Sequence, residues 1–154
     1  VKDHATLLRA QALLPDVRVA IAGRGDEEAR LRALAEELGV AGRLHLLGLR
    51  DDVDRILRSG DAFVQPSRSE GLPLAVLEAM AAGCVVVASD IPAHRELARE
   101  AVLYADDAAA MVEAAMAVLS SPSLWARLSA AGPGRLPERA AVRAQWLHFW
   151  DQTR

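Results

Sequence analysis

The chain has 154 residues, 52% of them hydrophobic, and a formal net charge of −3 from 18 basic and 21 acidic side chains. This length suits one compact domain with its own core, and the absence of a basic excess argues against nucleic acid as a partner. A single cysteine, Cys84, allows no internal disulfide and suits a reducing, cytoplasmic compartment. No apolar stretch is long enough to span a bilayer.

Short aliphatic runs alternate along the chain with longer segments of helical periodicity. The runs predict strands at 17–22, 43–47, 61–65, 85–88 and 101–104, and their nearly continuous hydrophobicity indicates strands covered on both faces. Apolar residues at helical spacing predict helices near 7–14, 31–38, 53–57, 75–82, 111–119 and 124–128, followed by a C-terminal helix at 138–151. Gly39 and Gly60 are placed to end the second and third of these helices.

The alternation of strands and helices predicts an α/β fold, a Rossmann-like parallel sheet with helices on both faces. Ligands of such sheets bind at the carboxyl ends of the strands. The loop after the first strand contains Gly23 and Gly25, whose missing side chains allow a close backbone approach to a ligand. It lacks the third glycine of a dinucleotide-binding loop, so a plain turn with Asp26 capping the next helix is an equal alternative.

A second loop, at 66–73, follows the third strand and leads into the helix that carries Glu78. Gly71 permits an unusual backbone angle, and Pro73 suits the first position of a helix. The amides of Leu74 and Ala75 are then expected to be free at the positive end of that helix. Such an end is an anion site suited to a diphosphate.

Glu70 and Glu78 are expected to face the same pocket. A carboxylate beside a phosphate site is repelled by it, so each needs another purpose, such as accepting hydrogen bonds from sugar hydroxyls. Alternatively, Glu70 caps the helix and Glu78 is an ordinary polar residue. Because the helix from Ala75 to Ala82 is apolar almost all round, we expect Glu78 to be buried, which favours a functional role.

Several other signals have a plain structural interpretation. Asp52 and Asp54 lie on a predicted helix that an aspartate caps, and the four histidines lack a paired metal spacing, so no metal or other cofactor is expected. His94 is expected at the surface and Cys84 in the core. The C-terminal aromatics are expected to pack on the last helix; they are Trp146, Phe149 and Trp150.

The segment 66–89 resembles the signature of family-4 retaining glycosyltransferases of the GT-B fold. The residues that carry the resemblance are Pro66, Ser67, Glu70 to Pro73, Leu77 to Gly83 and Val85 to Ser89, with seven residues between the two glutamates. It implies that 1–154 is the C-terminal, donor-binding domain of a two-domain enzyme. It also implies that the domain's first strand, which normally lies in the middle of the sheet, precedes this sequence.

The resemblance also implies roles for individual residues. Glu70 would act at the reacting end of the donor sugar, Glu78 would bind the ribose and Lys2 would neutralise phosphate. Backbone contacts to the sugar and diphosphate would come from Gly71, Leu72, Pro73, Leu74 and Ala75. The loop of Gly23 and Gly25 would join the site, and the base would lie near Leu47.

A family member of this kind transfers a sugar from a nucleotide-diphosphate donor, with retention at the anomeric carbon, to an acceptor held by the N-terminal domain. The chain alone is therefore expected to bind the donor without transferring the sugar. The parent enzyme would be compatible with peripheral membrane association. The alternatives are a related GT-B epimerase or phosphorylase domain and a non-catalytic interaction domain.

Overall fold

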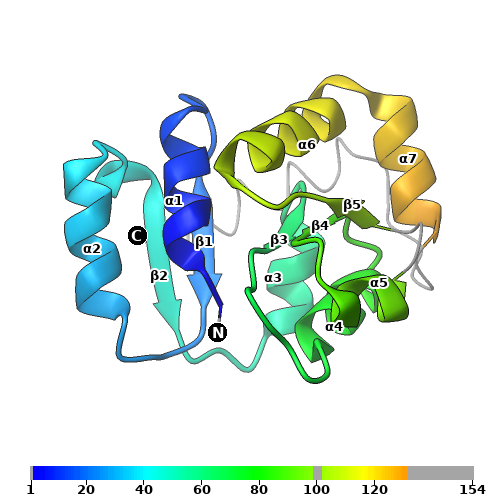
Figure 1. Cartoon of the computed structure of the whole chain (residues 1–154), viewed down its shortest axis with the longest axis horizontal. Helices are drawn as coiled ribbons and strands as arrows, with labels where there is room; N and C mark the ends of the chain where they lie inside the picture. Colours follow the sequence, from blue (N-terminus) through cyan, green and yellow to red (C-terminus); the bar gives the residue numbers. More distant parts are fainter. Residues whose placement is uncertain (1, 99–101, 132–154) are drawn as a thin grey trace.

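A computed structural model of the chain describes residues 2–98 and 102–131 (Figure 1). Its strands are β1 (Val19–Ala22), β2 (Leu44–Gly48), β3 (Phe63–Gln65), β4 (Val86–Ala88) and β5 (Val102–Tyr104). Its helices are α1 (His4–Ala12), α2 (Glu28–Glu37), α3 (Val53–Ser59), α4 (Leu74–Ala81), α5 (Pro92–Ala98), α6 (Ala108–Ser120) and α7 (Pro122–Ala131), with a 3-10 turn at Ala41–Arg43. All five predicted strands are confirmed, whereas the helix predicted at 138–151 and its aromatics lie outside the described residues.

The strands form two parallel sheets instead of one. β1 pairs with β2, and β3, β4 and β5 pair in that order. Within residues 2–98 and 102–131 no strand pairs with both β1 and β3, so the two sheets are separate. The prediction of strands covered on both faces is wrong for β1 and β2, where Ala22 is exposed and every residue of β2 is half-buried. Among the strands that the structure describes, β1 pairs only with β2.

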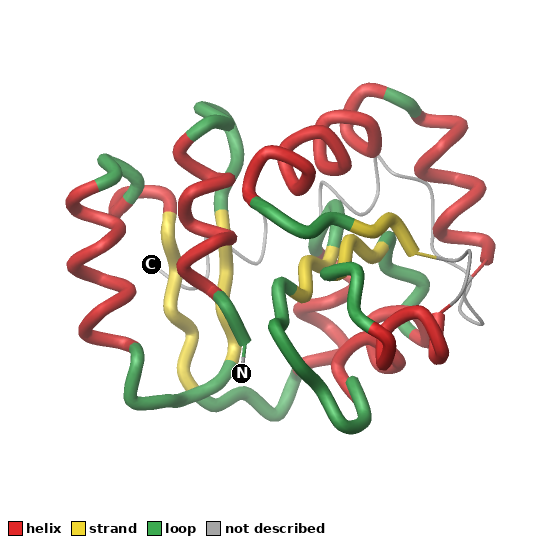
Figure 2. The backbone as a smooth tube through the Cα atoms, viewed as in Figure 1, coloured by secondary structure: helices red, strands yellow, loops and turns green. Residues whose placement is uncertain are grey.

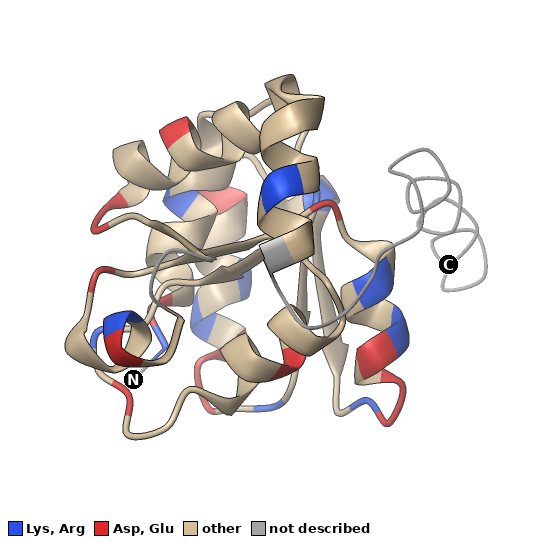
Figure 3. Cartoon of the chain, turned by 90° about the vertical axis from the view of Figure 1, so that its right-hand side faces the viewer, with Lys and Arg blue, Asp and Glu red and all other residues tan. Residues whose placement is uncertain are grey.

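The core of the larger sheet is arranged around β4. Side chains alternate between the two faces of a strand, and the clusters follow this rule. Val86 and Ala88 pack with residues of α4 and α5, while Val87 packs with residues of α1 and α6. Val85, just before the strand, packs against α6 and α7. Helices therefore cover both faces of this sheet (Figures 1 and 3), and each fully buried valine stabilises the fold by about 1.5–3 kcal/mol.

The helix ends follow local chemistry. Asp3 caps α1 by accepting from the Thr6 amide at 3.3 Å. Gly39, predicted to end α2, directly follows the C-cap residue Leu38 and has a φ of 68°. The prediction that Asp26 caps α2 is wrong, because Glu27 holds the N-cap position and makes no capping bond. An aspartate does precede α3, but both oxygens of Asp52 accept from Arg50 at 2.8 Å.

No single helix among the described residues has the length and apolarity to cross a membrane. α6 and most of α7 meet the length and composition only when taken together, and they are bent by 101° at the break between them.

Candidate functional site

The loops that follow β1, β2 and β3 lie along the same side of the molecule, the lower side in Figure 2, where the chain also begins. The start of the chain contacts the loop after β3 through hydrogen bonds and an ion pair. The Asp3 amide donates to the Pro66 carbonyl at 2.9 Å, and the Asp3 carboxylate pairs with Arg68 at 2.8 Å. Lys2 forms an antiparallel bridge with Ser67. The predicted cation is therefore brought to the predicted donor loop.

Glu70 is held in this loop by two buried donors. Its Oε1 accepts from the Ser67 hydroxyl at 2.6 Å and from the Gln65 amide at 2.9 Å. Burial raises the pKa of the Glu70 carboxyl. The two hydrogen bonds and the nearby charge of Lys2 together lower that pKa by more than burial raises it, so it lies below its ordinary value of 4.5. Glu70 is therefore ionised at neutral pH. Its bonds go to Ser67 in the same loop and to Gln65 at the end of β3, and α4 has Pro73 as its N-cap residue with no side-chain capping bond, so the alternative that Glu70 caps α4 is wrong.

The start of α4 differs from the prediction in three details. Pro73 is the N-cap residue, one position before the first helical residue. The Leu74 amide is occupied, because it donates to the Leu72 carbonyl at 2.9 Å across a tight turn. Gly71 has no positive φ, so its expected unusual angle is wrong. The Ala75 amide makes no hydrogen bond to another described residue and remains the free donor at this helix end.

Glu78 is exposed, so the prediction of a buried glutamate is wrong. α4 turns only Val76 and Ala79 fully into the core. Its outer face carries Glu78 together with Leu74 and Leu77, which are 57% and 39% exposed. Helix composition alone does not reveal that one side of α4 is left uncovered. Leu72, in the loop of Glu70, is also exposed.

The loop after β1 lies against the end of β2. Gly23 has a φ of 129°, and its amide donates to the Gly48 carbonyl at 2.7 Å. Gly25 has no positive φ, and a Cβ at either Gly23 or Gly25 would meet no atom within 4 Å. The structure thus brings Gly23 next to Gly48 and the preceding, half-buried Leu47. Gly48 itself has a φ of 66°, which explains why a glycine ends this strand.

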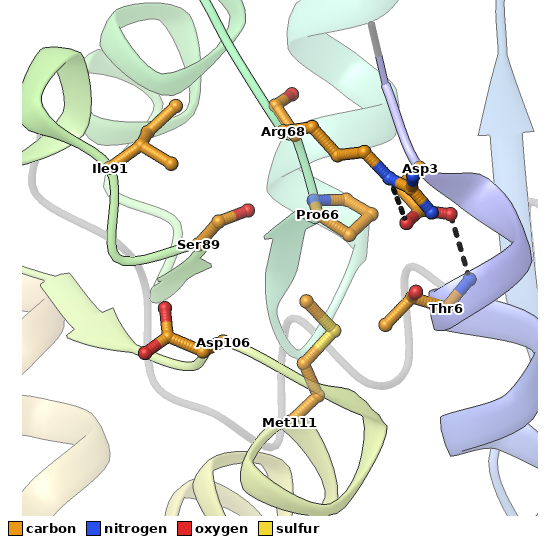
Figure 4. A pocket seen from close by; sticks show the side chains of 9 residues that line it. Asp3, Thr6, Pro66, Arg68, Ser89, Ile91, Asp106 and Met111 are labelled. Atoms are coloured by element: carbon orange, nitrogen blue, oxygen red, sulfur yellow. Dashed lines mark hydrogen bonds and ion pairs between the residues drawn. The ribbon is translucent and has the colours of Figure 1, made fainter.

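A cavity of about 240 Å³ lies next to Pro66 and Arg68, at the beginning of the loop that carries Glu70 (Figure 4). It is enclosed by the start of α1, the ends of β3 and β4 and the start of α6. Its lining residues are Asp3, Thr6, Pro66, Ser67, Arg68, Ser89, Ile91, Asp106 and Met111. The residues predicted to contact the donor do not line it, and the cavity shares only Pro66, Ser67 and Arg68 with the loop at 66–73.

The remaining sequence predictions have mixed outcomes. Cys84 is buried, as predicted. His94 is fully buried, so its predicted surface position is wrong: its Nδ1 lies 2.8 Å from the Ser89 carbonyl oxygen, which fixes α5 against the end of β4. In the part of the chain that the structure describes, no group of three or more His, Cys, Asp or Glu is placed to hold a metal ion. The donors to Glu70, Gln65 and Ser67, were not predicted as site residues; the signal was a glutamine ending an otherwise apolar strand.

The sequence model of the family described as "Glycosyl transferases group 1" matches residues 1–135. A phosphatidyl-myo-inositol mannosyltransferase of Mycolicibacterium smegmatis is 37% identical over 156 residues, which cover 96% of this chain and 40% of that protein. The chain thus spans well under half the length of this curated relative.

Solved structures share the fold. HepE of Anabaena, in complex with UDP and glucose, aligns over 98% of this chain and 45% of its own, with a TM-score of 0.79 and 19% identity. The catalytic domain of cholesterol-α-glucosyltransferase from Helicobacter pylori aligns over 96% and 91%, with a TM-score of 0.72 and 22% identity. The α/β architecture is therefore that of GT-B glycosyltransferases, and the family match shows that the chain belongs to the group 1 glycosyl transferases.

Proposed function

We propose that this chain is the donor-binding domain of a retaining glycosyltransferase and that it binds a nucleotide-diphosphate sugar at the loop of Glu70. One observation carries the proposal: an ionised glutamate is held by two buried donors at the carboxyl edge of a parallel sheet, beside a lysine. This edge is where α/β sheets bind ligands. The UDP and glucose named with the similar Anabaena structure are ligands of the same class.

The charges at the site suit the two ends of such a donor. Glu70 uses one oxygen for Ser67 and Gln65, which leaves Oε2 to accept from the hydroxyls of the sugar. Lys2 and the free Ala75 amide supply positive charge to the diphosphate. When the bond between the sugar and the diphosphate breaks, negative charge grows on the leaving diphosphate, and fixed cations and dipoles stabilise it.

The exposed residues around this centre suit the rest of the donor. Glu78 presents a solvated carboxylate on the outer face of α4, where it can accept from the ribose hydroxyls. Backbone at Gly71, Leu72 and Pro73 lines the approach to the sugar. The open loop of Gly23 and Gly25, with the backbone near Leu47, receives the base.

The acceptor is held by an N-terminal domain that is not part of this chain. The chain spans 40% of the mannosyltransferase relative, which is compatible with a division of labour between two domains. The chain alone then binds the donor and transfers no sugar.

Calorimetric titration with UDP-, GDP- and ADP-sugars tests the proposal. One nucleotide class should bind, and Glu78→Ala should weaken its binding about tenfold, the effect of losing one good hydrogen-bonding carboxylate. Glu113→Ala is the matched control, because Glu113 is an exposed glutamate on α6, away from the loop of Glu70. A folded chain that binds no nucleotide sugar, or equal effects of the two substitutions, contradicts the proposal.

A further inference from the structure

Two buried polar side chains converge on one oxygen of Glu70. Gln65 is 3% exposed and Ser67 is 1% exposed, yet both point their donors at Glu70 Oε1. The Gln65 amide also lies 3.2 Å from the Ser67 hydroxyl, so the three side chains form one closed network. Buried polar groups of this kind are uncommon unless their hydrogen bonds are satisfied.

The fold prevents both donors from turning away. Gln65 is the last residue of β3, and its carbonyl accepts from the amide and the hydroxyl of Ser89, at 3.0 and 3.1 Å. Ser67 is fixed by its backbone bridge to Lys2. If Glu70 rotated away, the Gln65 amide would keep only the longer bond to the Ser67 hydroxyl, and the Ser67 hydroxyl would lose the acceptor it has in Glu70. The carboxylate therefore has one favourable orientation.

We propose that Gln65 and Ser67 are positioning residues, which hold Glu70 as a carboxylate with Oε1 occupied and Oε2 turned to the donor sugar. The inference rests on the proposed donor site, since it assigns a ligand to Oε2. Two donors on a single oxygen favour the charged form of the group and fix its plane. Within the described residues, the charged side chain that acts on Glu70 is that of Lys2, while Arg68 is engaged by Asp3.

A purely structural role for the same bonds makes a different prediction. Ser67 and Glu70 are three residues apart, so their bond could serve only to shape the turn between β3 and α4. Removing it would then lower the stability of the turn and weaken the sugar and the nucleotide contacts alike. The Glu70 titration would rise in either case, because the carboxylate loses a donor, so the comparison of sugar and nucleotide affinities separates the two roles.

The test uses Ser67→Ala and Gln65→Met, which remove one donor each and leave the other. The titration of the Glu70 carboxyl carbon is followed by NMR, with its signal assigned through Glu70→Gln. Affinities for the nucleoside diphosphate and for the nucleotide sugar are measured in parallel. Ser129→Ala is the matched control: Ser129 is also a buried serine, and its hydroxyl donates to the Gly83 carbonyl at 3.0 Å.

We expect the Glu70 titration to move to higher pH in both variants and to stay in place in Ser129→Ala. The ratio of the affinity for the nucleotide sugar to the affinity for the nucleoside diphosphate should fall at least about fivefold in both variants. The affinity for the nucleoside diphosphate should stay nearly the same. An unchanged Glu70 titration in folded Ser67→Ala overturns the inference, as does a parallel loss of sugar and nucleotide affinity. If Gln65→Met does not fold, Ser67→Ala still decides, because it removes a single oxygen atom.

The two proposals fail in different ways. If the wild-type chain binds no nucleotide sugar, the proposed function fails and no ligand remains for Oε2. If the wild-type chain binds the donor, but the variants change neither the titration of Glu70 nor the affinity that the sugar adds, only the positioning role of Gln65 and Ser67 fails.

Discussion

Glu70→Gln separates the sugar contact from the integrity of the loop. The glutamine side-chain oxygen can still accept from Ser67 and Gln65, at the positions now 2.6 and 2.9 Å from Oε1. The substitution therefore keeps the two internal bonds and replaces Oε2, the proposed sugar acceptor, by a neutral NH2 group that donates. The substitution should therefore affect only the ligand group that contacts Oε2, which is the proposed donor sugar.

The size of the effect follows from the kind of bond that is lost. A hydrogen bond to a charged group contributes about 1.5–3 kcal/mol, and about 1.4 kcal/mol corresponds to a tenfold change in affinity. Nucleotide-sugar binding should therefore weaken roughly tenfold to a hundredfold. Binding of the nucleoside diphosphate alone should stay the same or tighten, because a negative charge near the phosphates has been removed.

Paired calorimetric titrations of the wild type and Glu70→Gln with the diphosphate and with its sugar measure this split. Circular dichroism checks that both proteins are folded. If the two ligands lose affinity by the same factor, Glu70 acts on the loop as a whole and the sugar contact is refuted. If neither ligand loses affinity, Glu70 lies outside the donor site.

Four further predictions concern stability and reactivity. Val87→Ala, at a fully buried position, should cost about 2–3 kcal/mol in urea unfolding, from two lost methyl groups and the cavity they leave. The Cys84 thiol, whose pKa burial raises to about 12, should react with a thiol reagent at pH 8 only when the chain unfolds. A double-mutant cycle on Arg68 and Asp3 should give less than about 1 kcal/mol, since the Arg68 side chain is 76% exposed. Folding lowers the pKa of Glu70, so its stabilising contribution should be complete above pH 4.5 and be lost as pH falls through the lower folded-state pKa. The measurement is the free energy of unfolding as a function of pH, compared between the wild type and Glu70→Gln.

The strands and most helices could be predicted because their patterns are dense. β4 lies in an unbroken apolar run, Val85 to Ala88, and is buried on both faces. α5 was missed because its seven residues, from Pro92 to Ala98, mix polar and apolar types without a clear stripe. The burial of His94 was missed with it, since a single histidine gives no indication of the face it occupies.

The loop of Glu70 could be located from the sequence, but its internal geometry could not. The loop pattern identified Glu70, the family resemblance placed Lys2 at the same site, and the structure brings them together. The exposure of Glu78 depends on which side of α4 other elements cover, which is a tertiary property. The convergence of Gln65 and Ser67 on one oxygen depends on side-chain directions at a strand end, which residue types alone do not determine.

The central claim is that a nucleotide sugar binds at the loop of Glu70, and the position of the bound donor tests it most directly. Backbone amide shifts of the chain, recorded by NMR during titration with the nucleotide sugar that binds in calorimetry, report which residues it contacts. We expect the largest changes at Gly23, Gly71 and Ala75, with smaller ones near Lys2 and Glu78. Changes concentrated instead around the cavity of Thr6 and Met111, with the loop of Glu70 unmoved, would contradict the account.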